Sequence, residues 1–175
     1  GNKHLNFAIS KKSKFFSRIE EFKSAILTQK EYNKILHATY ASADQHDWPA
    51  VETQAHKKSG TTTADARETI KACGPPDKEI NADGWTNLIF PSDGSKPYGR
   101  DIEVFLSLTN KLNLELIVIK GKDYNECTAK MRSGEVDLMS NLADKDDRSD
   151  YMKLMSYMDC SMMKWKCPGN GKINF

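Results

Sequence analysis

Residues 134–148 (Gly-Glu-Val-Asp-Leu-Met-Ser-Asn-Leu-Ala-Asp-Lys-Asp-Asp-Arg) hold the side chains best suited to bind a small anionic molecule. The pattern predicts that residues 136–139 are the last part of a parallel strand and that residues 140–143 form a loop at its carboxyl end. Arg148 would then lie in the helix that follows. Loop amides and hydroxyls together with a guanidinium bind carboxylates well, because Arg donates two parallel hydrogen bonds. The alternative is a surface ion pair between Asp144 and Arg148 at i, i+4, worth only a few tenths of a kcal/mol. Taken alone, the segment favours this second interpretation.

Other chemical motifs are weak. The four histidines have no zinc-type spacing among themselves or with cysteine, so we expect no metal site. They are His4, His37, His46 and His56. Gly121-Lys122 and Gly171-Lys172 lack the upstream Gly and the following Ser or Thr of a phosphate-binding loop. No cysteine is adjacent to a histidine, and we expect neither a cofactor nor enzymatic activity.

The cysteines leave their own chemistry open. Cys73, Cys127, Cys160 and Cys167 permit three disulfide pairings. Their even number suits an oxidising compartment. Buried free thiols are an equal alternative.

The elements that must position these residues are clearest in the second half. Apolar runs predict strands at residues 69–73 and 114–120, besides the one that ends at 139. Helical spacing predicts helices over about residues 100–112 and from Tyr124 to Gly134, with Asn113 in a left-handed conformation. This β-α-β-α-β order predicts a parallel sheet with ligands at the carboxyl ends of its strands.

The first third predicts a short strand and two helices. Residues 5–9 alternate apolar and polar side chains, Phe15 to Ile26 have one apolar helical face, and Tyr32 to Tyr40 have another. Residues 43–68 have almost no periodic apolar positions and are interpreted as a linker or a long surface loop.

Composition limits the class of protein. The 175 residues include 26 Lys and Arg against 24 Asp and Glu, a net charge of +2, so we expect no nucleic-acid partner. No apolar run approaches the roughly 20 residues that cross a bilayer. Residues 1–4 are polar, so no signal peptide opens the chain. A soluble α/β domain is the expectation.

Four stretches, in order, resemble the first lobe of bacterial extracellular solute-binding proteins, especially the polar amino-acid binding group of ABC transporters. They are residues 96–103 (Lys-Pro-Tyr-Gly-Arg-Asp-Ile-Glu), 112–116 (Leu-Asn-Leu-Glu-Leu), 133–139 (Ser-Gly-Glu-Val-Asp-Leu-Met) and Asp147-Arg148. The match covers about residues 69–175. It implies a three-layer α/β lobe with a mostly parallel sheet, as in the first lobe of a type II periplasmic binding protein.

The resemblance also assigns roles. In that family the position matching Arg148 binds the α-carboxylate of the ligand, assisted by those matching Ser140, Asn141 and Ala143. Its aromatic stacking partner follows the first strand, which makes Trp85 the candidate. Arg100 departs from the family, which has an aromatic or apolar residue there.

Residues 1–42 resemble the end of the same family, whose closing strand and helices return to pack on the first lobe. The tail therefore precedes the head, and the segment that would build the second lobe is missing. This order fits either a circularly permuted lobe joined through residues 43–68 or a piece spanning two tandem copies. In both cases the chain is one α/β lobe.

The resemblance implies a non-catalytic module of the periplasm or extracellular space. It would bind an amino acid or related carboxylate for ABC-type uptake or sensing, with a permease or sensor kinase as partner. A lone lobe should bind weakly, because the second lobe supplies about half of the contacts. The alternatives are a sensory or protein-interaction domain that has lost the ligand, with homodimerisation or strand exchange, and a dehydratase of cyclic carboxylates.

Overall fold

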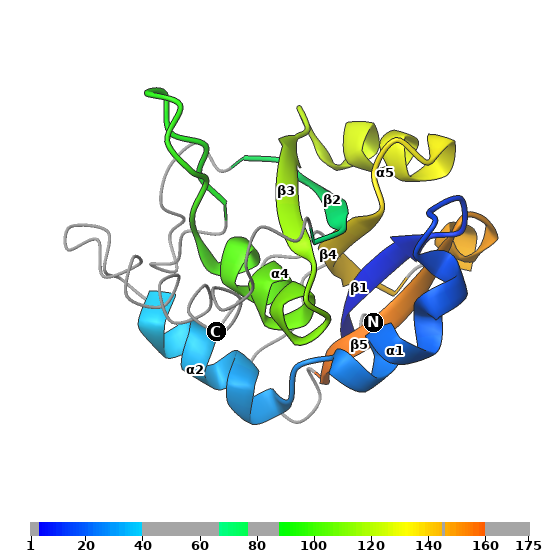
Figure 1. Ribbon diagram of the computed structural model, residues 1–175, viewed down its shortest axis with the longest axis horizontal. Helices are drawn as coiled ribbons and strands as arrows, with labels where there is room; N and C mark the ends of the chain where they lie inside the picture. Colours follow the sequence, from blue (N-terminus) through cyan, green and yellow to red (C-terminus); the bar gives the residue numbers. More distant parts are fainter. Residues whose placement is uncertain (1–3, 40–66, 77–87, 145, 160–175) are drawn as a thin grey trace.

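The computed structural model describes residues 4–39, 67–76, 88–144 and 146–159 (Figure 1). Its strands are β1 (His4–Ser10), β2 (Thr69–Gly74), β3 (Glu115–Lys120), β4 (Leu138–Ala143) and β5 (Met152–Asp159). Its α-helices are α1 (Ile19–Ala25), α2 (Gln29–Thr39), α4 (Arg100–Lys111) and α5 (Tyr124–Ser133). Two short 3-10 helices, η1 (Phe16–Arg18) and η2 (Asp146–Asp150), complete the described elements.

The five strands form one mixed sheet in the order β3-β2-β4-β1-β5. β2 is parallel to β3 on one side and to β4 on the other. β1 is antiparallel to both β4 and β5, so the other four strands all run in one direction. The predicted α/β class with a mostly parallel sheet is therefore confirmed, and the N-terminal strand lies inside the sheet of the second half.

Helices cover both faces of this sheet (Figure 1). α1, α2 and α4 pack together on one face, and α5 packs on the other against β1, β2 and β4. Successive side chains of β1 point to opposite faces of the sheet. Phe7 belongs to the larger apolar cluster with Phe105 of α4, whereas Ala8 belongs to the cluster beneath α5. This alternation is what a strand buried on both faces requires.

Local sequence signals set the helix boundaries. The Thr28 hydroxyl accepts from the Glu31 N–H and the Glu31 carboxylate accepts from the Thr28 N–H, a capping box that begins α2. α5 begins where the Asp123 carboxylate accepts the Glu126 N–H and ends at Gly134 in the left-handed conformation. Asn113, after α4, has a φ of 54°, so its predicted left-handed conformation is confirmed.

One expectation for the end of the sheet was wrong, and one strand was not predicted. Residues 140–143 are not a loop but the second half of β4, because β1 pairs with them: Asn6 lies opposite Leu142 and Leu5 opposite Ala143. The sequence also gave no indication of β5. Its alternation is broken at Tyr157 and Met158, both buried, where the register with β1 shifts by one residue.

Several sequence predictions lie outside the described residues. They are the linker at residues 43–66, the aromatic candidate Trp85, and the cysteines Cys160 and Cys167.

Candidate functional site

The carboxyl ends of β2 and β4 form the place where this topology favours ligand binding. The chain leaves β2 toward β3 on one side and later returns to β4 on the other, so the strand order reverses between them. In open α/β sheets, ligands bind at such a switch point, outside the carboxyl ends of the strands. β2 ends at Gly74 and β4 at Ala143, so the candidate site lies beyond these two residues.

A bulge distorts β4 just before this edge. Asn6 of β1 lies opposite Leu142 and Ala8 lies opposite Met139, so Phe7 alone faces both Ser140 and Asn141. Asn141 takes up the extra length with a φ of 61°, in the left-handed region. Bulges of this kind are frequent beside functional sites, where they redirect a side chain.

The redirected Asn141 side chain is buried without hydrogen bonds. It is 2% exposed, and neither its amide nitrogen nor its amide oxygen has a hydrogen-bond partner within the part of the chain that the structure describes. A buried amide without a partner costs about 1–3 kcal/mol. Asn141 therefore has one buried donor group and one buried acceptor group that no described residue satisfies.

Arg148 lies on η2, directly after the same strand. Its Nη1 donates to the carbonyl oxygen of Ala143 at 2.8 Å, which fixes the guanidinium at the carboxyl end of β4. This bond engages one of its five N–H groups. Arg148 is part-buried, a setting in which a guanidinium binds an anion more strongly than at a fully exposed position.

Asp144 makes contacts that sequence reasoning missed. Its carboxylate accepts from Asn6 Nδ2 at 2.8 Å and lies 3.0 Å from His4 Nδ1. Asn6 Nδ2 also donates to the Leu142 carbonyl. Asp144 is thus held by β1, and the alternative of an i, i+4 pair with Arg148 is wrong, since Arg148 turns to Ala143 instead.

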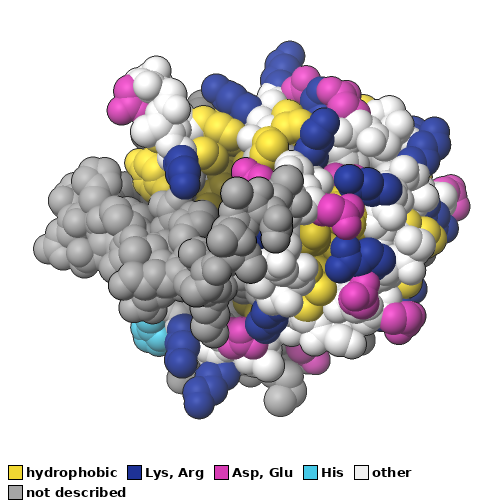
Figure 2. Space-filling model, in the orientation of Figure 1, with side chains coloured by type: hydrophobic (Ala, Val, Ile, Leu, Met, Phe, Trp, Pro, Cys, Tyr) yellow, Lys and Arg dark blue, Asp and Glu magenta, His cyan; other side chains and the backbone are white. Residues whose placement is uncertain are grey.

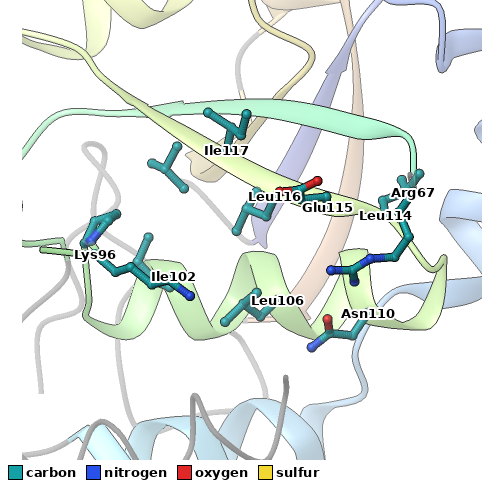
Figure 3. Close-up of a pocket in the computed structure, with 11 residues that line it drawn as sticks. Arg67, Lys96, Ile102, Leu106, Asn110, Leu114, Glu115, Leu116 and Ile117 are labelled. Atoms are coloured by element: carbon teal, nitrogen blue, oxygen red, sulfur yellow. The ribbon is translucent and has the colours of Figure 1, made fainter. Parts of the chain in front are cut away.

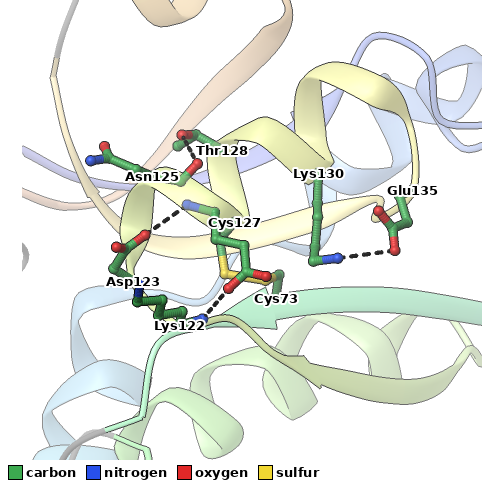
Figure 4. The surroundings of a disulfide bond; sticks show 9 residues. Cys73, Lys122, Asp123, Asn125, Cys127, Thr128, Lys130 and Glu135 are labelled. Atoms are coloured by element: carbon green, nitrogen blue, oxygen red, sulfur yellow. Dashed lines mark hydrogen bonds and ion pairs between the residues drawn. A yellow bond between two sulfur atoms is a disulfide. The ribbon is translucent and has the colours of Figure 1, made fainter.

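A disulfide fixes the neighbouring edge. Cys73, at the end of β2, is bonded to Cys127 of α5, with their Cα atoms 5.6 Å apart (Figure 4). Gly121 leaves room for the bond: a Cβ there would lie against Cys127 Sγ and 3.0 Å from Cys73 Sγ. The bond joins β2 to α5 beside the switch point, so this edge is held in place covalently.

Arg100, the departure from the family pattern, opens α4 as a buried cation. It is 2% exposed, its Nη2 has no hydrogen-bond partner among the described residues, and the Asp101 carboxylate lies 4.0 Å from its Nε. Burial raises the pKa of the nearby Tyr32 to about 12 and raises that of Tyr157 well above its usual value, so both stay neutral.

The residues gathered at this end of β4 supply hydrogen-bonding groups and one guanidinium. Within the described ranges, no three His, Cys, Asp or Glu side chains lie close enough together to hold a metal ion. The structure brings Ser140, Asn141, Ala143 and Arg148 to one end of β4. It adds Asn6 and Asp144, whose separation in sequence concealed them.

Comparisons with family models, curated proteins and solved structures found no match. Among the described helices, none has the length and apolar character needed to cross a membrane.

Proposed function

We propose that this chain is one lobe of a type II periplasmic-binding-protein fold and binds an amino acid or related carboxylate at the carboxyl ends of β2 and β4. The position of β1 supports the lobe assignment. A closing strand that returns to the first lobe has to insert between strands of that lobe. β1 does so, because it lies between β4 and β5 and is antiparallel to both.

The single observation that carries the binding proposal is the Asn141 amide. It is buried, its nitrogen and its oxygen have no hydrogen bonds to described residues, and it lies on a bulge at the switch point. In the proposed complex, Arg148 donates to the ligand carboxylate and Asn141 bonds to the adjacent polar group. Ala143 acts through its carbonyl oxygen, which orients Arg148. Ser140 lies in the bulge beside Asn141. Trp85 remains the proposed stacking partner.

The disulfide supports a periplasmic or extracellular location, because structural disulfides persist in oxidising compartments. In that location the module would hand its ligand to an ABC permease or report it to a sensor kinase. Binding without covalent chemistry is the proposed activity, since the described site residues supply hydrogen-bonding groups and one guanidinium.

Titration calorimetry with a panel of free amino acids tests this proposal. We expect saturable binding that Arg148→Ala weakens roughly ten- to hundredfold, because a hydrogen bond to a charged group contributes about 1.5–3 kcal/mol. The matched control is Arg18→Ala, since Arg18 lies on η1 beyond Ser10, at the opposite edge of the sheet. If no amino acid binds, or if both variants bind alike, the site is not a carboxylate receptor.

A further inference from the structure

A second site lies far from the switch point, along the outer edge of β3. A groove of about 370 Å³ runs between β3 and α4 (Figure 3). Ile102 and Leu106 of α4 form one wall, and Leu116 and Val118 of β3 form the other. Neither the carboxylate receptor nor the disulfide uses these side chains.

The main chain of β3 is open beside this groove. Among the described strands β3 is the last in the sheet and pairs only with β2. The N–H of Glu115 donates to Glu68 and that of Gly121 donates to Gly74, both on the β2 side. Because main-chain groups alternate along a strand, those of Leu116, Val118 and Lys120 point outward to the free edge.

This edge lacks the usual protection against pairing. Native edges carry charges, prolines or bulges in the middle of the strand. β3 has its two charges at its ends, Glu115 and Lys120, around an unbroken Leu-Ile-Val-Ile run. The Ile117 side chain is 45% exposed, and among the described residues no other large hydrophobic residue is exposed. In Figure 2, hydrophobic side chains (yellow) are exposed beside Lys and Arg side chains (dark blue) on this side of the molecule.

Charge identifies the occupant. Lys96 lies at one end of the groove and Arg67 at the other, with the apolar walls between them (Figure 3). Glu115 also lines the groove. Two copies of this chain paired edge to edge about a two-fold axis would bring Lys96 of one copy beside Arg67 of the other, and would set Glu115 of one β3 opposite Lys120 of the other. A segment with acidic ends and apolar residues between them would instead pair with both.

We propose that β3 and the groove bind an extended acidic peptide segment of a partner protein by strand addition. The segment bonds to the outward main-chain groups of Leu116, Val118 and Lys120. Every second side chain lies over Ile102 and Leu106, and its acidic ends meet Lys96 and Arg67. Main-chain bonds give affinity in this mode and the alternate side chains give specificity.

The test uses the whole chain and a capped synthetic peptide, Asp-Thr-Val-Thr-Val-Thr-Asp, which places its valines and aspartates on one face. We expect the peptide to slow hydrogen exchange at the amides of Leu116, Val118 and Lys120, while those bonded to β2 are protected with or without it. The double variant Lys96→Glu/Arg67→Glu should weaken binding about tenfold or more and improve binding of a lysine-ended peptide.

Val118→Pro should abolish binding, because it removes an outward N–H without removing a bond to β2. If that variant fails to fold, the same peptide N-methylated at its three central residues tests the wild-type chain, and it should not bind. The proposal is overturned if the methylated peptide binds equally, or if the aspartate- and lysine-ended peptides bind alike. It is also overturned if the aspartate-ended peptide does not bind, or if light scattering shows a dimer that Val118→Pro dissociates, since a second copy then occupies the edge.

Discussion

Removing the Cys73–Cys127 disulfide should destabilise the fold by an amount that the chain length between the cysteines sets. The bond closes a loop with a sequence separation of 54 residues. Loop-closure entropy for this length gives about 4 kcal/mol at 25 °C. For a chain of this size, that loss lowers the melting temperature by roughly 8–16 °C.

A double-mutant cycle separates the bond from the packing of the two sulfur atoms. Either single variant, Cys73→Ala or Cys127→Ala, already breaks the disulfide, so each should cost about as much as the double variant. The free energies of unfolding come from urea denaturation followed by circular dichroism. If the thiols were free, each Ala would remove one small buried group and the two losses would add.

Alkylation provides the matched chemical control. In the denatured, unreduced wild-type chain, a thiol reagent should label neither Cys73 nor Cys127, as peptide mass analysis reports. Additive losses in the cycle, or labelling of both residues, would refute the disulfide and remove the support it gives for an oxidising location.

Three further predictions concern buried groups on the two faces of the sheet. Gly121→Ala should cost about 1–3 kcal/mol by crowding the disulfide, and much less in the Cys73→Ala/Cys127→Ala chain, as urea unfolding measures; equal losses in both would contradict this. Arg100→Met should leave stability unchanged or raise it, because the guanidinium is buried and the Asp101 carboxylate, its partner among the described residues, lies 4.0 Å away; a loss above about 2 kcal/mol would contradict it. Burial raises the pKa of Tyr32 to about 12, so the neutral side chain stabilises the folded state below pH 10 and about 2 kcal/mol of this contribution should be lost between pH 10 and 12; Tyr32→Phe should reduce the alkaline loss while the contribution of Tyr157 remains, and an unchanged profile would contradict it.

Local signals predicted much of the fold. The helices begin and end where short-range bonds determine them, as at Asn113 and at Gly134. β3 was predicted because its run from Leu116 to Ile119 is continuously apolar and mostly β-branched, and β2 because Gly74-Pro75-Pro76 ends its short segment. These features depend on neighbours in the sequence, so the sequence contains the information directly.

Long-range pairing set what could not be predicted. β4 continues to Ala143 because Leu5 and Asn6 pair with its last residues. The sequence around β4 cannot indicate a pairing with residues more than 130 positions away. β5 was missed because a register shift against β1 buries the consecutive residues Tyr157 and Met158. One missed pairing therefore turned a strand into a predicted loop.

The candidate site divides in the same way. The structure brings Arg148 and Ala143 together, since both lie in one short segment. Asn6 and Asp144 meet only through the sheet. The bulge at Asn141 exists only because β1 is one residue shorter than β4 across that interval, so its buried amide could not be read from the sequence.

The most direct test of the carboxylate receptor is nuclear magnetic resonance of its own side chains during titration with amino acids. We predict saturable shifts of the Asn141 side-chain amide and the Arg148 guanidinium signals, while Arg18 and the outer edge of β3 stay unchanged. If an amino acid binds but shifts only signals elsewhere, or if neither Asn141 nor Arg148 responds to any amino acid, the proposed site at the ends of β2 and β4 is contradicted.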